Sequence, residues 1–406
     1  METLSQERLG TLPEASAAGE PSSAAALIRT ARALATNVDA VRENLESERA
    51  LPIDLVDALG AAGMFSLWLP KSLGGAELDA VGYVRVIEEL SRLDGSVGWC
   101  ASIASAYSCI AGYLQSDVAS RIYDGGRTVV AGAVMPSGKA FVASGGYRVT
   151  GHWTYGSGIR HSQWTLGNCI VHDGDGPRKG PGGVPEMRLA LFPTSSAEVI
   201  DTWRVSGLRG TGSNDYRVAD LFVPEEYTIS YPAPPPVQDG TLYAMPMISL
   251  LAVAIAAVPL GIARAAIDAV IALAATKALY GSSTLLRDRP AVQADVARAE
   301  ILLGSARSYL FSLFGELWDE VAAGAVIPLR RRAMVRLACA NAGQVSAQAV
   351  DLMYNAAGGT ALLESGRLER CFRDVHACTQ HIAISTMNYE AGGRVLLGLD
   401  PGMPRL

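Results

Sequence analysis

The hydrophobic periodicity of the chain changes twice, and this feature most constrains its fold. Early apolar residues recur at three- and four-residue steps, as in LIRTARALATNV, which indicates helices. Short apolar runs such as TVVAGAV and WTLGNCIV then alternate with Gly, Pro, Ser and Asp turns, which indicates strands. The helical spacing later returns. We therefore expect a mainly α protein with a central β domain, divided into an N-terminal helical domain (25–124), a β-barrel-like middle domain (125–230) and a C-terminal four-helix bundle (241–406).

Two further segments have a composition typical of neither helix nor strand. Residues 1–24 are rich in Ser, Ala, Glu and Pro and are expected to form a disordered lead-in. The proline-dense stretch YPAPPPVQDG, at 231–240, is expected to be a linker. Beyond the long apolar seam that begins near residue 292, helices are expected at 330–356 and 369–398, separated by a GG pair.

Composition excludes several classes of function. The 406 residues carry a net charge of −6 and no long basic block, so nucleic acid is not expected as a partner. Hydrophobic residues make up 49% and charged residues 18%, which is typical of a well-buried globular protein. The six cysteines form no CxxC pair, so neither disulfides nor a zinc cluster is expected. The N-terminal residues lack a basic start and an apolar core, and we expect a cytoplasmic protein.

One segment has the length of a membrane span. Residues 244–263 are uncharged, and twenty residues are about what a bilayer core requires. The segment is alanine-rich and contains two prolines, however, and Arg264 and Asp268 follow directly on the same expected helix. These features favour a buried helix of the bundle over a membrane helix.

Common catalytic motifs are absent from the sequence. His376 and His381 are five residues apart, which places them about 140° apart around a helix and disfavours a shared metal ion. Ser157 stands in YGSG, which lacks the first glycine of the hydrolase motif GxSxG. The glycines of GLRGTGSND do not follow the dinucleotide-binding order GxGxxG. We therefore expect no metal site, no serine hydrolase and no Rossmann domain.

A polar layer in the β region, set between two apolar helical domains, could hold a flat aromatic cofactor. Backbone and hydroxyl groups of such a layer can meet the polar edge of an isoalloxazine ring while the helices enclose it. Ordinary turn chemistry in a β domain is the alternative interpretation. The residues of this layer are Trp153, Ser157, Trp203, Arg209, Thr211 and Ser213.

Five sequence stretches, in this order, resemble the acyl-CoA dehydrogenase superfamily. They are GWCASIAS, GGYRVTGHWTYGSG, DTWRVSGLRGTGSND, LFVPEE and GGTALLESGRLERCFRDVHACTQHI. The resemblance covers about residues 25 to 400. Within the superfamily the chain is most similar to the oxygenase components of two-component flavin monooxygenases, such as 4-hydroxyphenylacetate and phenolic-steroid hydroxylases and dibenzothiophene monooxygenase.

This resemblance implies a function. The expected enzyme is a homotetramer that receives reduced FMN or FAD from a separate NAD(P)H:flavin reductase. The reduced flavin and O₂ would form a C4a-hydroperoxyflavin that oxygenates a small aromatic, polyketide or heteroatom-containing substrate. The alternatives are an acyl-CoA dehydrogenase with bound FAD and an amino-sugar N-oxygenase similar to the nitrososynthases. A catalytically silent protein that retains the scaffold is a third class.

The C-terminal stretch bears on the dehydrogenase alternative. Many acyl-CoA dehydrogenases carry a catalytic Glu shortly after an Arg-Asp pair, because removing the substrate α proton needs a base. Here Arg373 and Asp374 are followed by VHACTQHIAIST, and the next carboxylate is Glu390. This pattern disfavours the dehydrogenase without excluding it, since some dehydrogenases place the Glu elsewhere.

The resemblance also assigns roles to individual residues. His381 is expected to donate a hydrogen bond to the flavin hydroperoxide, and Ser157 is expected to lie at flavin N5; these two are the candidate catalytic residues. Tyr107 stands where phenol-hydroxylating relatives carry a His, so a partner for a phenolate is not evident. The expected cofactor-binding residues are Trp153, Tyr155, Ser157, Arg209, Thr211, Ser213, and, toward a neighbouring subunit, Arg289 and Gln293. The expected substrate-binding residues are Trp99, Tyr107 and His376, of which His376 could be structural instead.

Overall fold

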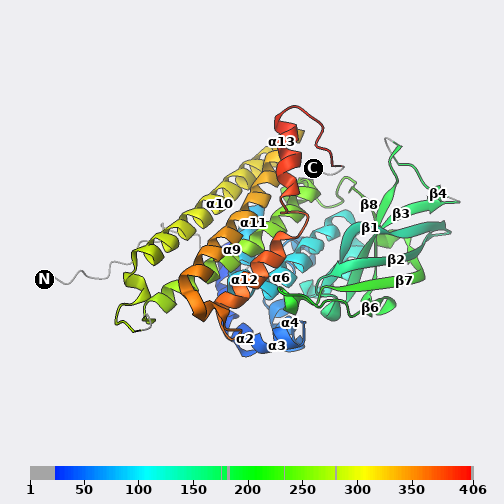
Figure 1. The fold of residues 1–406 in the computed structure, drawn as a ribbon. Helices are drawn as coiled ribbons and strands as arrows, with labels where there is room; N and C mark the ends of the chain where they lie inside the picture. The colour runs from blue at the N-terminus through cyan, green and yellow to red at the C-terminus, as the bar shows by residue number, and fades with distance from the viewer. Residues whose placement is uncertain (1–22, 175, 181–182, 233, 279–280, 404–406) are drawn as a thin grey trace.

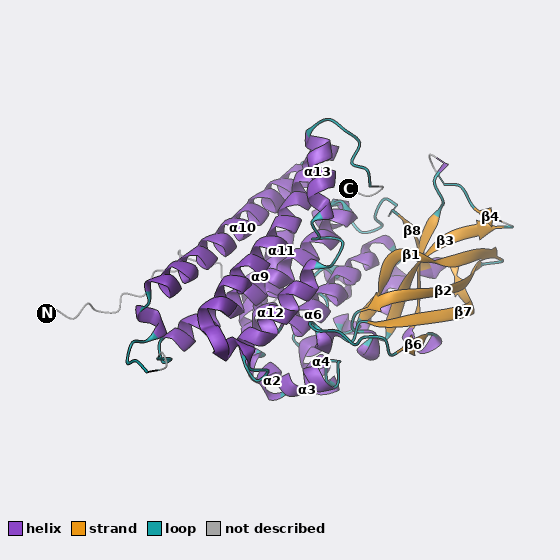
Figure 2. Cartoon of the chain, in the orientation of Figure 1, coloured by secondary structure: helices purple, strands orange, loops and turns teal. Residues whose placement is uncertain are grey.

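The computed structural model describes residues 23–174, 176–180, 183–232, 234–278 and 281–403. Nearly all of the predicted lead-in, 1–24, lies outside these residues. Helices gather on one side of the molecule and strands on the other (Figure 2). The arrangement agrees with the two changes of periodicity in the sequence.

Among the N-terminal helices, α6 contacts both the C-terminal bundle and the sheet. Asp79 begins α5 by accepting a hydrogen bond from the Gly82 N–H, and Asp94 begins α6 by accepting from the N–H groups of Ser96 and Val97. Nearly every residue of α6 is buried. The helices are α1 Ala24–Ala33, α2 Ala35–Ala40, α3 Arg42–Ser47, α4 Ile53–Ala61, α5 Ala80–Leu93, α6 Gly95–Ser108 and α7 Ser116–Ile122.

The strands form one mixed sheet in the order β6-β7-β2-β1-β3-β5-β8, with β4 paired to β3. β1 and β2 form a hairpin that closes at the pair Ala143↔Gly146, whereas β1 and β3 run parallel. β2 pairs with β7 as far as Gly156↔Asn214, which brings the residues that follow β2 beside those that precede β7. The strands are β1 Val130–Ala143, β2 Gly146–Gly156, β3 Trp164–Asp173, β4 Gly176–Pro177, β5 Met187–Pro193, β6 Glu198–Ile200, β7 Asn214–Pro224 and β8 Thr228–Tyr231.

The C-terminal helices form the bundle that packs against α5 and α6 (Figure 1). α9 has the length and composition of a membrane helix, but 89% of its most apolar 18-residue window is buried inside the protein. It is a buried helix of the bundle, as the sequence predicted. The helices are α8 Thr241–Ala244, α9 Met247–Ala274, α10 Pro290–Ala322, α11 Leu329–Ala357, α12 Arg367–Thr379 and α13 Met387–Leu396.

The prediction of a single helix at 369–398 is wrong, because a turn at 380–386 divides this stretch into α12 and α13. The side chain of Asn388 explains the break: it is fully buried, and its Nδ2 donates to the carbonyls of Ile382 and Ser385, each at 2.9 Å. These carbonyls are thereby satisfied without a continuous helix. The break places His381 on a turn.

Candidate active site

Five side chains meet where the sheet faces the helices. Trp99 of α6 donates from Nε1 to Ser157 Oγ at 3.0 Å, just beyond the end of β2. Ser157 Oγ lies 2.7 Å from Ser213 Oγ, which lies 2.7 Å from Thr211 Oγ1. The ring of His381 packs edge-on against Trp99, with centroids 5.6 Å apart. The structure thus brings together residues expected separately as catalytic, cofactor-binding and substrate-binding.

The direction of the hydrogen bonds in this group is fixed by its two ends. The Trp99 indole can only donate, and Thr211 Oγ1 donates to the carbonyl of Leu208 at 2.8 Å, which can only accept. Each hydroxyl has one proton, so Ser213 donates to Thr211 and Ser157 donates to Ser213. The proton of Ser157 is therefore engaged, and its remaining lone pair can accept from a further N–H group.

His381 is a neutral hydrogen-bond donor. Its Nδ1 accepts the N–H of Ala383 at 3.1 Å, so the ring proton resides on Nε2. Burial, together with the positive charge of Arg336, lowers the pKa of His381 to about 4. At neutral pH the imidazole can donate one proton from Nε2 without carrying charge.

Helix α12 holds the loop that carries Thr211 and Ser213. The Leu208 N–H donates to Asp374 Oδ1 at 2.6 Å. At Gly207 a Cβ would lie 2.1 Å from the carbonyl oxygen of Arg373, so only glycine permits this close approach. Burial and the neighbouring carboxylate of Asp94 raise the pKa of Asp374 to about 7. This loop and the bundle are thus joined through one buried carboxyl group.

Trp153 does not lie with this group, and its expected place beside a flavin is corrected. The side chain is 0% exposed and stacks on Tyr216 in the interior of the β domain, with centroids 5.2 Å apart. Its Nε1 donates to the carbonyl of Asn168. A Cβ at Gly138 or Gly167 would lie within 2.6 Å of the indole, so these glycines make room for it. A side chain enclosed in this way has no surface to offer a cofactor.

Tyr155 and Arg209 lie near the group but project differently. Tyr155 has a left-handed φ of 64° and is 69% exposed, with its ring edge-on to Trp203. Such a backbone conformation is strained for a tyrosine and often marks a functional turn. Arg209 is partly exposed and lies 3.8 Å from a carboxylate oxygen of Glu46. Their contact with a flavin stays a prediction.

The two other expected substrate-binding residues have partners elsewhere. Tyr107 is buried, and its hydroxyl donates to the carbonyl of Gly132 at 3.2 Å. His376 lies 2.9 Å from Asp351 Oδ1 on α11 and packs against Phe372. These contacts favour the structural role for His376.

Arg289 and Gln293 lie at the start of α10, at the end of the bundle away from the sheet (Figure 1). Gln293 Nε2 donates to the backbone carbonyl of Arg287 at 2.9 Å. Within one chain they cannot join the group around Ser157. Their expected contact with a neighbouring subunit stays a prediction.

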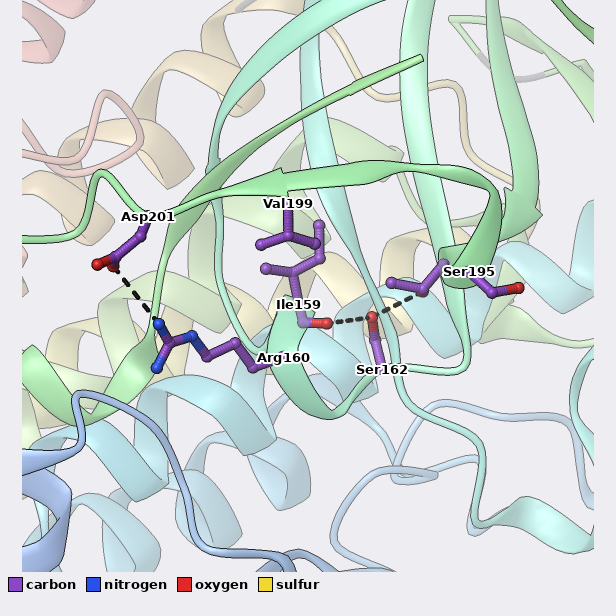
Figure 3. A pocket seen from close by; sticks show the side chains of 7 residues that line it. Ile159, Arg160, Ser162, Ser195, Val199 and Asp201 are labelled. Atoms are coloured by element: carbon purple, nitrogen blue, oxygen red, sulfur yellow. Dashed lines mark hydrogen bonds and ion pairs between the residues drawn. The ribbon is translucent and has the colours of Figure 1, made fainter.

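A pocket of about 420 Å³ lies on the β domain beside the turn that follows Ser157 (Figure 3). Its arginine, Arg160, is paired with Asp201 at 3.4 Å, and Ser162 is hydrogen-bonded to the carbonyl of Ile159 and to Thr194. The charges of Arg160 and Asp201 are thus paired within the wall of the pocket. None of the predicted site residues lines it.

Two features of the surroundings escaped the sequence analysis. His161, which the sequence analysis did not single out, is buried with neither ring nitrogen hydrogen-bonded, and burial lowers its pKa to about 4. Arg336, whose charge acts on His381, is buried in α11, and no local sequence pattern indicates a buried cation there. Among the residues described, no group of three or more His, Cys, Asp or Glu side chains could hold a metal ion.

Two family models match the helical parts of the chain. Residues 22–117 match the family described as "Acyl-CoA dehydrogenase, N-terminal domain", and residues 253–386 match "Acyl-CoA dehydrogenase, C-terminal domain". The indole-3-acetate monooxygenase of Pseudomonas putida is 32% identical over 90% of this chain and 93% of its own. The flavin-dependent monooxygenase oxygenase subunit HsaA of Mycobacterium tuberculosis is 30% identical over 88% of this chain and 91% of its own.

A solved structure agrees with these relatives. XiaF from a Streptomyces species, in complex with FADH₂ and glycerol, superposes with a TM-score of 0.87 over 94% of this chain and 98% of its own, at 26% identity. The chain belongs to the flavin-dependent monooxygenase branch of the acyl-CoA dehydrogenase superfamily. The predicted family, fold class, oxidoreductase activity and use of a flavin are confirmed. The name "oxygenase subunit" borne by HsaA implies a separate partner component.

The residues present fit a reduced flavin. The free lone pair of Ser157 can accept an N–H, and the reduced isoalloxazine presents one at N5, where the oxidised ring does not. The neutral Nε2–H of His381 suits an oxygen acceptor. The first carboxylate after Asp374, Glu390, is exposed on α13 and offers no buried base at this place.

Proposed function

We propose that this chain is the oxygenase component of a two-component system and oxygenates a small aromatic molecule. A separate NAD(P)H:flavin reductase supplies the reduced FMN or FAD. The bound flavin supplies two electrons to O₂, of which one oxygen atom enters the substrate and the other leaves as water. We further propose a cytoplasmic homotetramer, in which Arg289 and Gln293 of one subunit approach the cofactor of another.

The observation that carries this proposal is the one-way hydrogen-bond chain from Trp99 to the Leu208 carbonyl. It fixes Ser157 as an acceptor, which suits the N–H of a reduced ring. Trp99 is itself buried and helps to keep water from this place. Exclusion of water protects a reactive oxygen species from breakdown to peroxide.

His381 completes the arrangement. With a pKa of about 4 it is a poor base at neutral pH, so it does not suit removal of a substrate α proton. As a neutral donor it can hold a proton toward an oxygen atom that is transferred. This observation favours the oxygenase over the acyl-CoA dehydrogenase. The aromatic substrate is preferred to an amino sugar because the relative from Pseudomonas putida is named for indole-3-acetate.

The test compares flavin binding and oxygen use. Purified protein is titrated anaerobically with reduced and oxidised FMN and FAD, and O₂ consumption, H₂O₂ and product are then measured with photoreduced flavin. We expect tighter binding of reduced than of oxidised flavin, and turnover without any nicotinamide. Protein that holds oxidised FAD tightly and reduces an electron acceptor with acyl-CoA would instead be a dehydrogenase.

A further inference from the structure

Arg370 of α12 lies between two buried aspartates. Its Nη2 is 2.9 Å from Asp94 Oδ2, and its Nε is 3.9 Å from Asp374 Oδ2. All three residues are buried. One guanidinium group thus forms ion pairs with two carboxyl groups, and each of these carboxyl groups holds a different part of the candidate active site.

Asp94 holds the start of α6. Its Oδ1 accepts hydrogen bonds from the N–H groups of Ser96 and Val97, at 2.9 and 3.2 Å, and thereby caps the helix. Its other oxygen, Oδ2, faces Arg370. Trp99 follows on the next turn of α6, so the position of its indole depends on where the first turn is fixed.

Asp374 holds the 207–213 loop, which carries Thr211 and Ser213, against the same helix. Its Oδ1 accepts the Leu208 N–H at 2.6 Å, and the Leu208 carbonyl is the last acceptor of the hydrogen-bond chain that begins at Trp99. Its Oδ2 lies against the start of α6, because a Cβ at Gly95 would be 2.7 Å from this oxygen. The loop and the helix therefore meet on one carboxyl group.

A second contact brings the loop directly onto α6. A Cβ at Gly210 would lie 3.0 Å from Ser96 Cβ, so the backbone of the loop packs on the first turn of the helix. The hydrogen-bond chain begins on this helix and ends in this loop, and its bonds are 2.7 to 3.0 Å long. Hydrogen bonds weaken steeply when their geometry is lost, so the chain requires a fixed separation between helix and loop.

Arg370 also joins this interface to α3. Its Nη1 donates to the carbonyl of Arg42 at 2.9 Å, and its Nε lies 3.4 Å from Glu46 Oε1. The Arg42 side chain is itself 3.7 Å from Asp94 Oδ2. The planar guanidinium of Arg370 thus contacts four groups from three segments of the chain. A lysine ammonium is a single charge on a flexible stem and cannot reproduce this set of contacts.

We infer that Arg370 is a positioning residue for the flavin site. It fixes the separation between α6 and the 207–213 loop, and thereby the direction in which Ser157 offers its free lone pair. The alternative is a group of ion pairs that stabilises the fold and leaves the site unaffected. The inference rests on the proposed function, because the lone pair is offered to the N–H of a reduced flavin.

Two variants weaken the group in different ways. D94N keeps the cap of α6, because Asn caps helices as well as Asp does, and removes the charge that faces Arg370. R370K keeps the positive charge and loses the planar set of contacts. R307Q is the matched control, because Arg307 of α10 pairs at 2.8 Å with a largely buried carboxylate, Glu88 of α5, outside this group. Circular dichroism and thermal unfolding establish that each variant folds.

The first measurement needs no flavin. Protein labelled with ¹⁵N-tryptophan gives an indole N–H signal for Trp99 in NMR spectra, which is assigned by its absence from Trp99→Phe. We expect the proton resonance of this signal to move upfield in D94N and R370K, because the hydrogen bond to Ser157 weakens, and to stay in place in R307Q. An unmoved Trp99 signal in the folded variants of the group overturns the inference.

The second measurement is anaerobic titration with the reduced and oxidised forms of whichever of FMN and FAD binds more tightly. We expect D94N and R370K to bind reduced flavin about threefold to tenfold more weakly than the wild type, the range for one hydrogen bond, and to bind oxidised flavin as the wild type does. R307Q lowers the melting temperature and keeps the preference for reduced flavin. If R370K does not fold, D94N decides, because it leaves Arg370 in place.

The outcomes separate this inference from the proposed function. Equal weakening of both flavin states, or an unchanged preference for reduced flavin in folded D94N and R370K, leaves only a stabilising role for Arg370 and overturns the inference. A wild type that binds both flavin states equally contradicts the proposed function. In that case the flavin-free Trp99 signal alone decides whether Arg370 positions the helix.

Discussion

The indole Nε1–H of Trp99 donates to Ser157 Oγ at 3.0 Å and thereby ties α6 to the end of β2. The contact joins the helical and β parts of the chain at the candidate active site. It also begins the hydrogen-bond chain that determines which way the Ser157 proton points.

Trp99→Phe removes this donor and keeps an aromatic ring. We expect the free energy of unfolding to fall by about 1 kcal/mol, the usual value of a buried hydrogen bond, and H₂O₂ release to rise relative to product. Chemical denaturation and oxygen-use assays measure the two effects. Trp153→Phe is the matched control, because it also loses an indole hydrogen bond but in the sheet interior. Equal H₂O₂ release from both variants would contradict the role of Trp99.

Thr211→Val removes the hydroxyl that fixes the direction of the chain, at nearly constant volume. Ser213 then lacks its acceptor, so the proton of Ser157 is free to point elsewhere. We expect reduced-flavin affinity to fall several-fold, measured by anaerobic titration. Thr379→Val, which also removes a hydroxyl bonded to the carbonyl three residues earlier, serves as control. The directional account is wrong if the two variants bind reduced flavin as the wild type does.

His381→Ala should lower the fraction of O₂ that yields product more than it lowers flavin affinity, because the ring acts on oxygen.

His381 also contributes to the loss of folding stability at acid pH. Its folded pKa of about 4 lies below the ordinary 6.5, so its contribution to stability is present above pH 6.5 and is lost as the pH falls toward 4. His381→Gln should therefore unfold with a weaker pH dependence in this window. An unchanged product yield in His381→Ala would remove the donor role.

The contribution of Asp374 to stability should depend on pH in the opposite direction to that of His381. Its pKa is raised from 3.8 to about 7, so its contribution to stability is present below pH 3.8 and is lost as the pH rises through 7. Asp374→Asn keeps an acceptor for the Leu208 N–H and cannot ionise. We expect its melting temperature to fall less than that of the wild type between about pH 5 and pH 7. Asp351→Asn, at a half-exposed carboxylate, should behave as the wild type does.

Periodicity was sufficient to predict the α–β–α order, because the core-facing pattern of each element is local in sequence. The Ser157, Thr211, Ser213 and His381 group was also predictable, through motifs that carry the family resemblance. Trp153 shows the limit of inferring a side chain's position from the family resemblance. Its motif is present, but the glycines at 138, 151 and 167 leave space for the indole in the interior of the β domain. Such packing depends on residues from neighbouring strands and has no local signal.

Arg336 and Asn388 illustrate a second limit. A run of three arginines at the start of α11 is ordinarily a solvent-exposed face. Whether the next arginine is buried depends on the turn that breaks 369–398, and that break in turn depends on where Asn388 hydrogen-bonds. The burial of Arg336 therefore follows from tertiary contacts between α11 and α13.

The most direct test mixes the anaerobic complex of protein and reduced flavin with O₂ in a stopped-flow spectrometer. The account predicts an absorbing species distinct from both reduced and oxidised flavin, which persists in the wild type and decays faster with H₂O₂ release in His381→Ala. Reoxidation of the wild type in a single step to oxidised flavin, with one H₂O₂ per flavin and no product from any aromatic compound offered, would contradict it.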